Sequence, residues 1–393
     1  MSGALFSNRR FRSGAAYRLV EWCDLEQHEK ELLSGLYDES EVYGIFRPVV
    51  SRADLTIKVA YREIALIYLH LTHPRGLPHY LFMSSQEKAV IQLVLDGVLE
   101  IESEGGFLSG AASVPALLGD TLAPISGVPN YLSRLSTRAI NYGLRLRNQD
   151  PRSLANRLYT FNTVPWDARK KMAFLSEQSV REFLFSAATT STKRLLLELW
   201  TEEPLTEQSY WISWSKKKAN HEPAADKPTY KIYVSPVMRD LPVVFEQVAR
   251  ILSGEETISM KAGLRIEGLL RPDKMVAYFA NWESLASAAT RLSKALNGYS
   301  AQGVIFTAQL GESGLLSWGV DPPVTQLVNA VEAGSWRYSV ADQTALAILQ
   351  AQTEKVSDGE ALDFIRAKLL AAGVDTETWT HSNDPATVDF KLS

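Results

Sequence analysis

The sequence predicts an α+β fold, in which a mixed or antiparallel C-terminal sheet with flanking helices follows a mostly helical N-terminal region. Two observations support this prediction. From residue 229 to residue 323, short apolar runs that alternate with a period of two are separated by longer amphipathic stretches. Upstream of residue 200, most apolar residues instead recur at helical spacing. The 393 residues are enough for two or three domains, each with its own core.

Residues 1–112 are expected to form an N-terminal lobe. From Tyr17 to Leu36 the apolar residues recur at helical spacing, which predicts a helix. Residues 53–71 follow a break at Pro48 and fit either a strand or a buried helix, and the pattern does not decide between them.

A helix followed by a hairpin ends this lobe. Ser84 and Glu87 have the spacing of a capping box, and an amphipathic stretch follows them. Residues 99–111 predict two short strands about Gly105-Gly106. Together they have the outline of a winged helix. Because the helix carries no basic stripe, we favour docking or peptide binding over DNA binding.

Two further segments precede the predicted sheet. Residues 113–200 begin with a connection rich in proline and glycine and continue as amphipathic helices, expected at 131–148, 177–187 and 192–200. Residues 201–228 change composition sharply and are expected to form a linker. Within this linker, Trp211 and Trp214 lie in a strand-like run and are expected to share a face, where core packing is the default.

The segment 229–323 alternates strands and helices. Strands are expected at 231–234, 257–262, 273–279 and 303–308, and helical segments at 241–252, 264–270 and 282–299. Beyond it, residues 324–393 predict helices around 324–333, 338–353 and 359–372, followed by a polar tail.

Composition excludes several classes of protein. A net charge of −4, with 46% hydrophobic and 22% charged residues, argues against a nucleic-acid scaffold and against disorder. The single cysteine excludes an internal disulfide and a thiolate zinc cluster. No apolar run approaches the ~20 residues that a membrane span needs, and the basic N-terminus lacks the apolar core of a secretory signal. We therefore expect a soluble, cytoplasmic protein without nucleic-acid or membrane partners.

The usual motifs of metal and cofactor sites are missing from the sequence. His70, His73 and His79 cluster around two prolines without an HExxH motif, so solvent-exposed imidazoles are expected rather than a metal site. There is no GxSxG elbow, no P-loop and no GxGxxG. No metal and no cofactor is predicted.

Cations inside apolar runs are the most informative feature. Lys231, Lys261, Arg265, Arg271 and Lys274 lie in three neighbouring elements of 229–323. Burying an ammonium is costly unless it is paired, so the cluster suggests an anion held in a cleft. A partly desolvated lysine among other cations has a lowered pKa and could act as a general base. Lysines that snorkel at the rim of a half-exposed sheet are the simpler interpretation, and on physical grounds alone we favour it.

The segment also resembles a known family. Lys231-Ile232-Tyr233-Val234-Ser235 is similar to the Lys-apolar-His-apolar-Ser strand of phosphothreonine lyases of the SpvC/OspF type. Met260-Lys261 resembles their strand with the base lysine, and Arg271 with 274–279 resembles the arginine and strand that follow. Residues 303–323 are similar to a segment of the Hop-type effector-like proteins, the lyase components of class V lanthipeptide and thioamitide biosynthesis. The resemblance covers residues 229–323, about a quarter of the chain.

This resemblance implies a phospholyase-like fold and a lyase that eliminates phosphate from phosphoserine or phosphothreonine in a ribosomal precursor peptide. Lys261 would be the general base and Tyr233 the general acid, in a position where the classical lyases have histidine. The implied phosphate-binding residues are Lys231, Arg265, Arg271 and Lys274. The winged-helix-like lobe would bind the leader of the precursor peptide. A separate Ser/Thr kinase of the same pathway would supply the phosphorylated substrate.

Two alternatives stay open. The chain could be a non-catalytic or cyclase-like partner that keeps the lyase fold and binds the precursor peptide, the kinase or a true lyase. The tyrosine at 233 and the large helical region without a counterpart in the family favour this alternative. An effector that acts on host phosphoproteins is a third class, which the absence of an evident disordered, serine-rich N-terminus disfavours.

Overall fold

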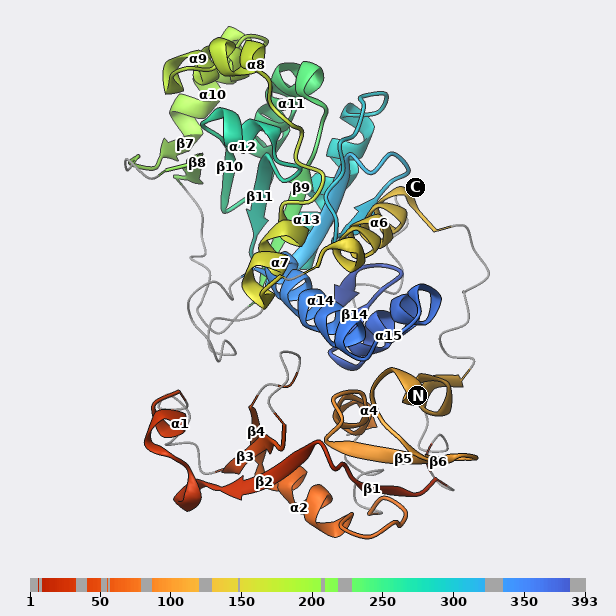
Figure 1. Ribbon diagram of the computed structural model, residues 1–393. Helices are drawn as coiled ribbons and strands as arrows, with labels where there is room; N and C mark the ends of the chain where they lie inside the picture. The colour runs from red at the N-terminus through yellow and green to blue at the C-terminus, as the bar shows by residue number, and fades with distance from the viewer. Residues whose placement is uncertain are drawn as a thin grey trace. The chain divides into compact units, whose positions relative to one another are not determined.

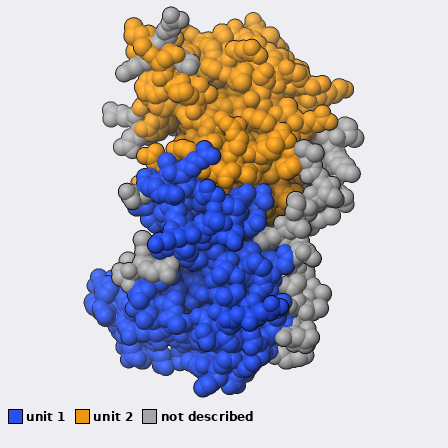
Figure 2. All heavy atoms as spheres, turned by 45° about the vertical axis from the view of Figure 1, so that its right-hand side comes forward, with its two compact units in different colours: residues 1–127, 143–151, 343–374 blue, residues 128–142, 152–342, 375–393 orange. Residues whose placement is uncertain are grey.

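The computed structural model describes residues 6, 9–32, 41–50, 55, 57–78, 87–119, 129–147, 149–205, 209–217, 228–321 and 335–381. The chain is α+β and forms two compact units, each assembled from three stretches of sequence (Figure 2). Unit 1 comprises residues 1–127, 143–151 and 343–374, and unit 2 comprises residues 128–142, 152–342 and 375–393. Both units are therefore discontinuous in sequence.

Unit 2 contains a seven-stranded sheet in which every neighbouring pair is antiparallel (Figure 1). In sheet order its strands are β12 (Ala308–Leu310), β13 (Leu316–Asp321), β9 (Thr229–Val234), β11 (Met275–Phe279), β10 (Ser259–Gly263), β8 (Trp211–Lys216) and β7 (Trp200–Glu202). The predicted mixed or antiparallel sheet is thus antiparallel.

The helices outside the N-terminal segment mostly belong to unit 2. They are α6 (Tyr131–Arg145), α7 (Pro151–Tyr159), α8 (Ala168–Ala173), α9 (Glu177–Leu184), α10 (Thr190–Leu199), α11 (Leu241–Ser253), α12 (Ile266–Leu270), α13 (Trp282–Ala295) and α14 (Trp336–Thr353), with a 3-10 turn η5 (Met238–Asp240). Three of them, α6, α7 and α14, have residues in both units.

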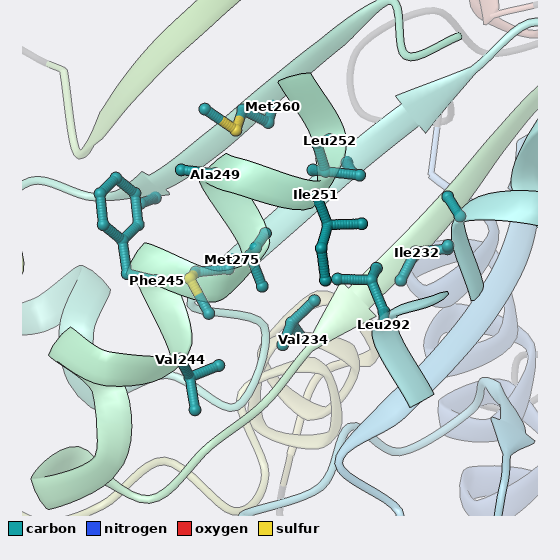
Figure 3. Packing of buried hydrophobic residues seen from close by; sticks show 14 of the residues in the cluster. Ile232, Val234, Val244, Phe245, Ala249, Ile251, Leu252, Met260, Met275 and Leu292 are labelled. Atoms are coloured by element: carbon teal, nitrogen blue, oxygen red, sulfur yellow. The ribbon is translucent and has the colours of Figure 1, made fainter. Parts of the chain in front are cut away.

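The core of unit 2 lies on one face of the sheet. Alternate residues of the strands, such as Ile232, Met260 and Met275, pack there against α11 and α13 (Figure 3). Phe245 and Leu292 are among the helix residues that complete this core. Because side chains alternate across a strand, the residues between them point to the opposite face of the sheet.

Unit 1 combines two three-stranded antiparallel sheets, ordered β1-β5-β6 and β2-β3-β4. Its strands are β1 (Phe11–Ser13), β2 (Tyr17–Glu21), β3 (Val42–Pro48), β4 (Lys58–Tyr61), β5 (Leu99–Ser103) and β6 (Gly106–Leu108). Its helices are α1 (Gln27–Leu32), α2 (Arg62–His70), α4 (Glu87–Leu95), α5 (Val114–Leu118) and α15 (Asp358–Ala371), with 3-10 turns η1 (Trp22–Asp24) and η3 (Gly110–Ser113). A second hydrophobic core joins α4 and α15 to these strands.

Two short strands, β14 (Val374–Asp375) and β15 (Thr380–His381), pair with each other near the end of the described chain. None of the described helices has both the length and the apolar character that crossing a membrane requires.

The N-terminal lobe differs most from expectation. The helix predicted from Tyr17 to Leu36 is wrong at its start, because residues 17–21 form β2 and pair with β3. Five residues can satisfy a helical spacing by chance, and pairing with a neighbouring strand outweighs such a pattern. Residues 53–71, which the sequence left open, contain both a strand, β4, and a helix, α2. Six strands lie in the described part of 1–112, so this lobe is not mostly helical.

The predicted hairpin at 99–111 is confirmed as β5 and β6, and the predicted helix before it is confirmed as α4. The capping-box residues 84–86 lie outside the described residues. A winged-helix assignment for this unit stays a prediction.

Most elements predicted beyond residue 130 are confirmed within a few residues at their ends. They are the strands at 231–234, 257–262 and 273–279 and the helices at 131–148, 177–187, 192–200, 241–252, 282–299, 338–353 and 359–372. The strand expected at 303–308 is wrong: Gly303 and Phe306 have φ of 89° and 58°, and a backbone with positive φ at two such positions is not extended. The helix expected around 324–333 lies outside the described residues.

The segment 201–228 contributes to the sheet. It holds all of β8 and most of β7, so it is not only a linker, although the division of the chain into five consecutive segments otherwise stays a prediction. Trp211 and Trp214 are three residues apart in β8 and therefore face opposite sides of the sheet. Trp214 packs in the core, whereas Trp211 lies beside Lys261 on the other face.

Candidate functional site

The sheet face opposite the core carries three of the five predicted cations, Lys231, Lys261 and Arg271. In β9 Ile232 and Val234 point into the core, so Lys231 and Tyr233 point to this face. The same alternation in β10 places Lys261 on it, between the core residues Met260 and Ala262. The register pairs Lys231 with Tyr278 and Lys261 with Val276 of β11. Three strands thus bring these side chains together.

Cations and aromatic rings alternate across this face. Lys231 lies 5.2 Å and Lys261 5.6 Å from the centre of the Tyr278 ring. Lys261 and Arg271 lie 4.6 Å and 5.5 Å from the Trp211 ring. Such distances are within the range of cation–π attraction, and the rings also keep water from the charges. We call the set Lys231, Lys261, Arg271, Arg337, Tyr159, Trp211, Tyr233 and Tyr278 the cation face.

Arg337 of α14 also belongs to the cation face. Its guanidinium lies 4.6 Å from the Tyr159 ring and 5.7 Å from the Tyr233 ring, and Arg271 lies 5.2 Å from the same Tyr159 ring. The Arg337 side chain is 1% exposed and donates to the carbonyl oxygens of Ile305 (3.2 Å) and Tyr159 (3.0 Å). These bonds fix its position.

Two buried carboxylates balance part of this charge. Asp273 accepts two hydrogen bonds of 2.8 Å from Arg271 and one of 2.7 Å from Arg337. Despite its burial, which by itself raises the pKa of Asp273, these arginines and Lys261 hold that pKa well below its usual range. Asp321 at the end of β13 forms an ion pair with Lys231. Three of the four cations are therefore paired with carboxylates.

Lys261 is the fourth cation. Among the described residues no carboxylate lies within ion-pair distance of its ammonium nitrogen. Burial, together with the positive charges of Lys231 and Arg271, lowers the pKa of Lys261 to about 8, although Asp273 and Asp321 partly oppose this. An amine with this pKa is partly neutral near pH 7, which is what proton abstraction requires.

Tyr233 is a buried phenol on this face. It packs with Val276, Val304 and Tyr278 and is 3% exposed. Burial, and secondarily the negative charge of Asp321, raises the pKa of Tyr233 well above its ordinary value, while Arg337 opposes the shift. Its hydroxyl therefore stays protonated at neutral pH and can donate a hydrogen bond.

A pocket of about 480 Å³ gives access to the Arg271 end of the face. The residues that line it include Arg271, Tyr159, Tyr338, Asn156 and Thr160. Its volume lies within the range of roughly 300–1,000 Å³ common for small-molecule sites. An anionic group that enters this pocket would lie beside Arg271.

Two predicted phosphate-binding residues lie outside this arrangement. Lys274 is 1% exposed, and its ammonium group donates to the carbonyl oxygen of Pro236 (2.7 Å) and to the side chain of Gln302. Burial lowers the pKa of Lys274 to about 7. Arg265 lies 3.5 Å from Glu177 and 5.5 Å from the Tyr210 ring. Phosphate binding by either residue stays a prediction that these contacts do not favour.

Sequence reasoning missed half of the cation face and both carboxylates. Asp273 follows Arg271 by two residues, a spacing that suits a local ion pair and could have been noticed. Arg337 and Tyr159 reach the face from distant parts of the chain and carry no local signal. Among the histidines, His70 and His73 are exposed as expected, and His79 lies outside the described residues. Within the described residues, no group of three or more His, Cys, Asp or Glu side chains could hold a metal ion.

Comparison with known proteins gives distant structural likenesses only. No protein-family model and no curated protein matches the sequence. An effector protein from Pseudomonas syringae pv. tomato strain DC3000 matches 63% of this chain and 97% of its own, with 11% identity and a TM-score of 0.40.

The matching structures that are named as phosphothreonine lyases include OspF and VirA (SpvC). OspF from Shigella flexneri matches 38% of this chain and 88% of its own at 8% identity, with a TM-score of 0.27. The VirA (SpvC) effector of Chromobacterium violaceum matches 54% and 98% at 10% identity, with a TM-score of 0.28. Likenesses this distant establish neither a shared family nor shared residues.

Proposed function

We propose that this protein is a carbon–oxygen lyase that eliminates phosphate from phosphoserine or phosphothreonine. The observation that carries the proposal is Lys261, a lysine with a lowered pKa and no carboxylate partner among the described residues, placed between the cations Lys231 and Arg271. A base beside an anion-binding group is the pair that a β-elimination needs. The resemblance of 229–279 to phospholyase strands supports the same assignment.

The elimination assigns a task to each side chain. Neutral Lys261 removes the proton from Cα, the Cα–Cβ double bond forms, and the Cβ–O bond breaks with its electron pair going to the phosphate oxygen. Arg271 and Lys231 stabilise the charge on the leaving phosphate. In the free protein these two cations are paired with Asp273 and Asp321, and the phosphate replaces these carboxylates as their partner. The Tyr233 hydroxyl donates a hydrogen bond to the leaving group. A dehydroamino acid and inorganic phosphate are released.

The substrate we propose is a ribosomal precursor peptide that a separate Ser/Thr kinase of the same pathway has phosphorylated. An open pocket beside Arg271 suits a side chain presented by a flexible peptide. The unit with α4 and the β5–β6 hairpin is proposed to bind the leader of that peptide.

Mass spectrometry tests the reaction directly. The protein is incubated with peptides that contain phosphoserine or phosphothreonine, and the loss of phosphoric acid is followed with time. We expect elimination by the wild type and none by Lys261→Ala or by Lys261→Arg, because a guanidinium keeps the charge but cannot act as the base. Lys294→Ala, an exposed lysine of α13, is the matched control. Elimination by Lys261→Ala at the wild-type rate would remove Lys261 from the mechanism.

A non-catalytic peptide-binding partner is the second candidate. The ion pairs Lys231–Asp321 and Arg271–Asp273 favour it, because two of the proposed phosphate-binding cations are already neutralised. This role predicts that the chain binds the phosphopeptide or copurifies with the kinase without any elimination. The mass assay therefore separates the two candidates.

A further inference from the structure

Unit 1 contains a second charged cavity that the proposed elimination does not use. The cavity has a volume of about 200 Å³. The charged and amide side chains that line it are Lys58 of β4, Gln92 of α4, Asp96 just after α4, Gln343 and Gln350 of α14, and Lys368 of α15. Four elements far apart in the sequence thus place two ammonium groups and one carboxylate around one small space.

The cavity has an excess of one positive charge. Asp96 is 8% exposed, forms an ion pair with Lys58 at 3.0 Å and another with Lys368. Lys368 also donates to the Gln350 side-chain oxygen at 3.1 Å. Both lysines hold the pKa of Asp96 low, at about 2, although burial opposes this, so the carboxylate stays ionised at neutral pH. With one carboxylate for two ammonium groups, the cavity attracts an anion.

The Gln92 side chain places a further constraint on the ligand of this cavity. Its amide nitrogen donates to Asp96 at 2.9 Å, which fixes the orientation of the amide because a carboxylate can only accept. The Gln92 side-chain oxygen is buried and has no hydrogen-bond partner among the described residues. Buried polar atoms are nearly always bonded, so a ligand that brings an N–H group would complete this one.

The size and the apolar part of the lining narrow the choice of ligand. The volume lies below the roughly 300–1,000 Å³ of typical small-molecule sites, so a single side chain fits better than a cofactor. Tyr17, Leu346 and Ala372 supply apolar surface beside the charged groups. A glutamate side chain combines a carboxylate, an apolar two-carbon stem and a neighbouring backbone N–H.

We propose that this cavity binds a glutamate of the peptide substrate, with its carboxylate at Lys58 and a backbone N–H at the Gln92 oxygen. Lys58, whose side chain is 27% exposed, is the more accessible of the two lysines, since Lys368 is 12% exposed. The proposal rests on the proposed function only in taking the ligand to be part of that enzyme's peptide substrate.

N-acetyl-glutamate N-methylamide is a suitable probe, because it has the carboxylate, the stem and the amide N–H but no phosphate. Its binding to the full chain is measured by saturation-transfer NMR, beside its glutamine counterpart. We expect the glutamine compound, the Lys58→Gln variant and the Gln92→Met variant each to weaken binding by about tenfold or more, since each removes one side of a charged or buried hydrogen bond. Lys294→Gln, which makes the same change of net charge in unit 2, is expected to bind the probe as the wild type does.

Three results would overturn the proposal. They are no binding of the glutamate compound, equal binding of the glutamine compound, and equal displacement by inorganic phosphate, which would indicate a general anion site. Circular dichroism of each variant shows whether it is folded. Since the probe has no phosphate, its binding is independent of elimination. A chain that binds the probe and never eliminates phosphate would refute the proposed function and leave this site standing.

Discussion

At the scale of single residues, Lys261 combines two properties that oppose each other. Its environment disfavours the charged amine, which makes it a usable base, and the same environment costs the folded state free energy whenever the amine is charged. The proposed role of Lys261 as a base and the stability of the fold therefore make different demands on this position.

The rate of elimination should follow the neutral fraction of Lys261. With a pKa of about 8, we expect the rate to rise about tenfold per pH unit below pH 8 and to level off above it. The measurement is the initial rate on a phosphopeptide between pH 6 and pH 9.5. A rate independent of pH across this interval would contradict the role of Lys261 as base.

Replacing Lys261 by methionine should stabilise the protein while it abolishes elimination. The pKa of Lys261 is lowered on folding, so the unfolded chain binds more protons between about pH 8 and pH 10.5, and the cost of the buried charge is complete below pH 8. We expect a gain in the free energy of unfolding of about 1–3 kcal/mol at pH 7. Denaturant titrations at pH 7 and pH 10 should show the gain shrinking at the higher pH.

Tyr233→Phe isolates the contribution of one hydroxyl. The ring keeps its packing with Val276 and Val304, so we expect an intact fold and a loss of kcat of about 100-fold, in the range for a group that assists a leaving group. Tyr299→Phe makes the same chemical change outside the cation face and serves as the control. A kcat for Tyr233→Phe within twofold of the wild type would leave Tyr233 as a packing residue.

The residues of the cation face that could be predicted from the sequence are those that lie in regularly alternating strands. The residues that reach the face from distant parts of the chain could not be predicted. Lys231, Tyr233 and Lys261 could be found because a cation or phenol inside an apolar strand breaks a local pattern. Arg337 is separated from its partner Asp273 by 64 residues, and no local pattern links them. Lys274 breaks the same pattern as Lys231, yet its partners are Pro236 and Gln302, which only the structure reveals.

At the scale of elements, the position of β10 depends on close contact with α12. A Cβ atom built on Gly263 would lie 2.5 Å from the backbone carbon of Gly268, so the two segments touch through their main chains. This contact holds the end of the strand that carries Lys261.

Gly263→Ala should therefore be destabilising. A methyl group at this position forces backbone to move, and we expect a loss of about 1–3 kcal/mol in the free energy of unfolding together with reduced elimination. Gly359→Ala is a matched control, because a Cβ there meets nothing within 4 Å and the residue lies in the first turn of α15. Chemical denaturation of both variants measures the difference. Equal stabilities would show that β10 and α12 can separate without cost.

The elements predicted correctly are those whose pattern is long or regular. α11 and α13 have apolar residues on one face over several turns, which predicts both helices, although α13 ends at Ala295 and not at residue 299. The irregular segment at 303–308 is apolar enough for a strand, but the positive φ of Phe306 is set by its tertiary surroundings. The strand pattern of β8 is visible in the sequence, but the lysines and prolines around it suggest a linker rather than a part of the sheet.

At the scale of the whole molecule, each unit has a hydrophobic core of its own. We expect thermal unfolding to show two transitions, and Asp96→Asn to lower the one that belongs to unit 1. The substitution leaves Lys368 buried without its carboxylate, at a cost of about 3–5 kcal/mol. Differential scanning calorimetry provides the measurement, with the exposed Asp363→Asn of α15 as control.

The same calorimetric measurement, repeated at lower pH, should show unit 1 losing stability. The pKa of Asp96 is lowered to about 2, so its contribution to stability is complete above about pH 4 and is lost as the pH falls towards 2. The wild type should lose this part of its unit 1 stability over that interval, and Asp96→Asn should not. The assignment would be contradicted if the wild type and Asp96→Asn unfolded in one transition at the same temperature throughout this pH interval.

The interleaving of the two units also constrains how the chain can fold during its synthesis. Ala361, Phe364 and Ala367 of α15 belong to the same core as the first strands, Phe11 and Tyr17 among them. A ribosome makes the N-terminal strands first and these three residues more than two hundred positions later. Until then the early strands have only part of the apolar surface that covers them in the finished protein. The N-terminal segment therefore cannot complete its hydrophobic core until most of unit 2 has been translated.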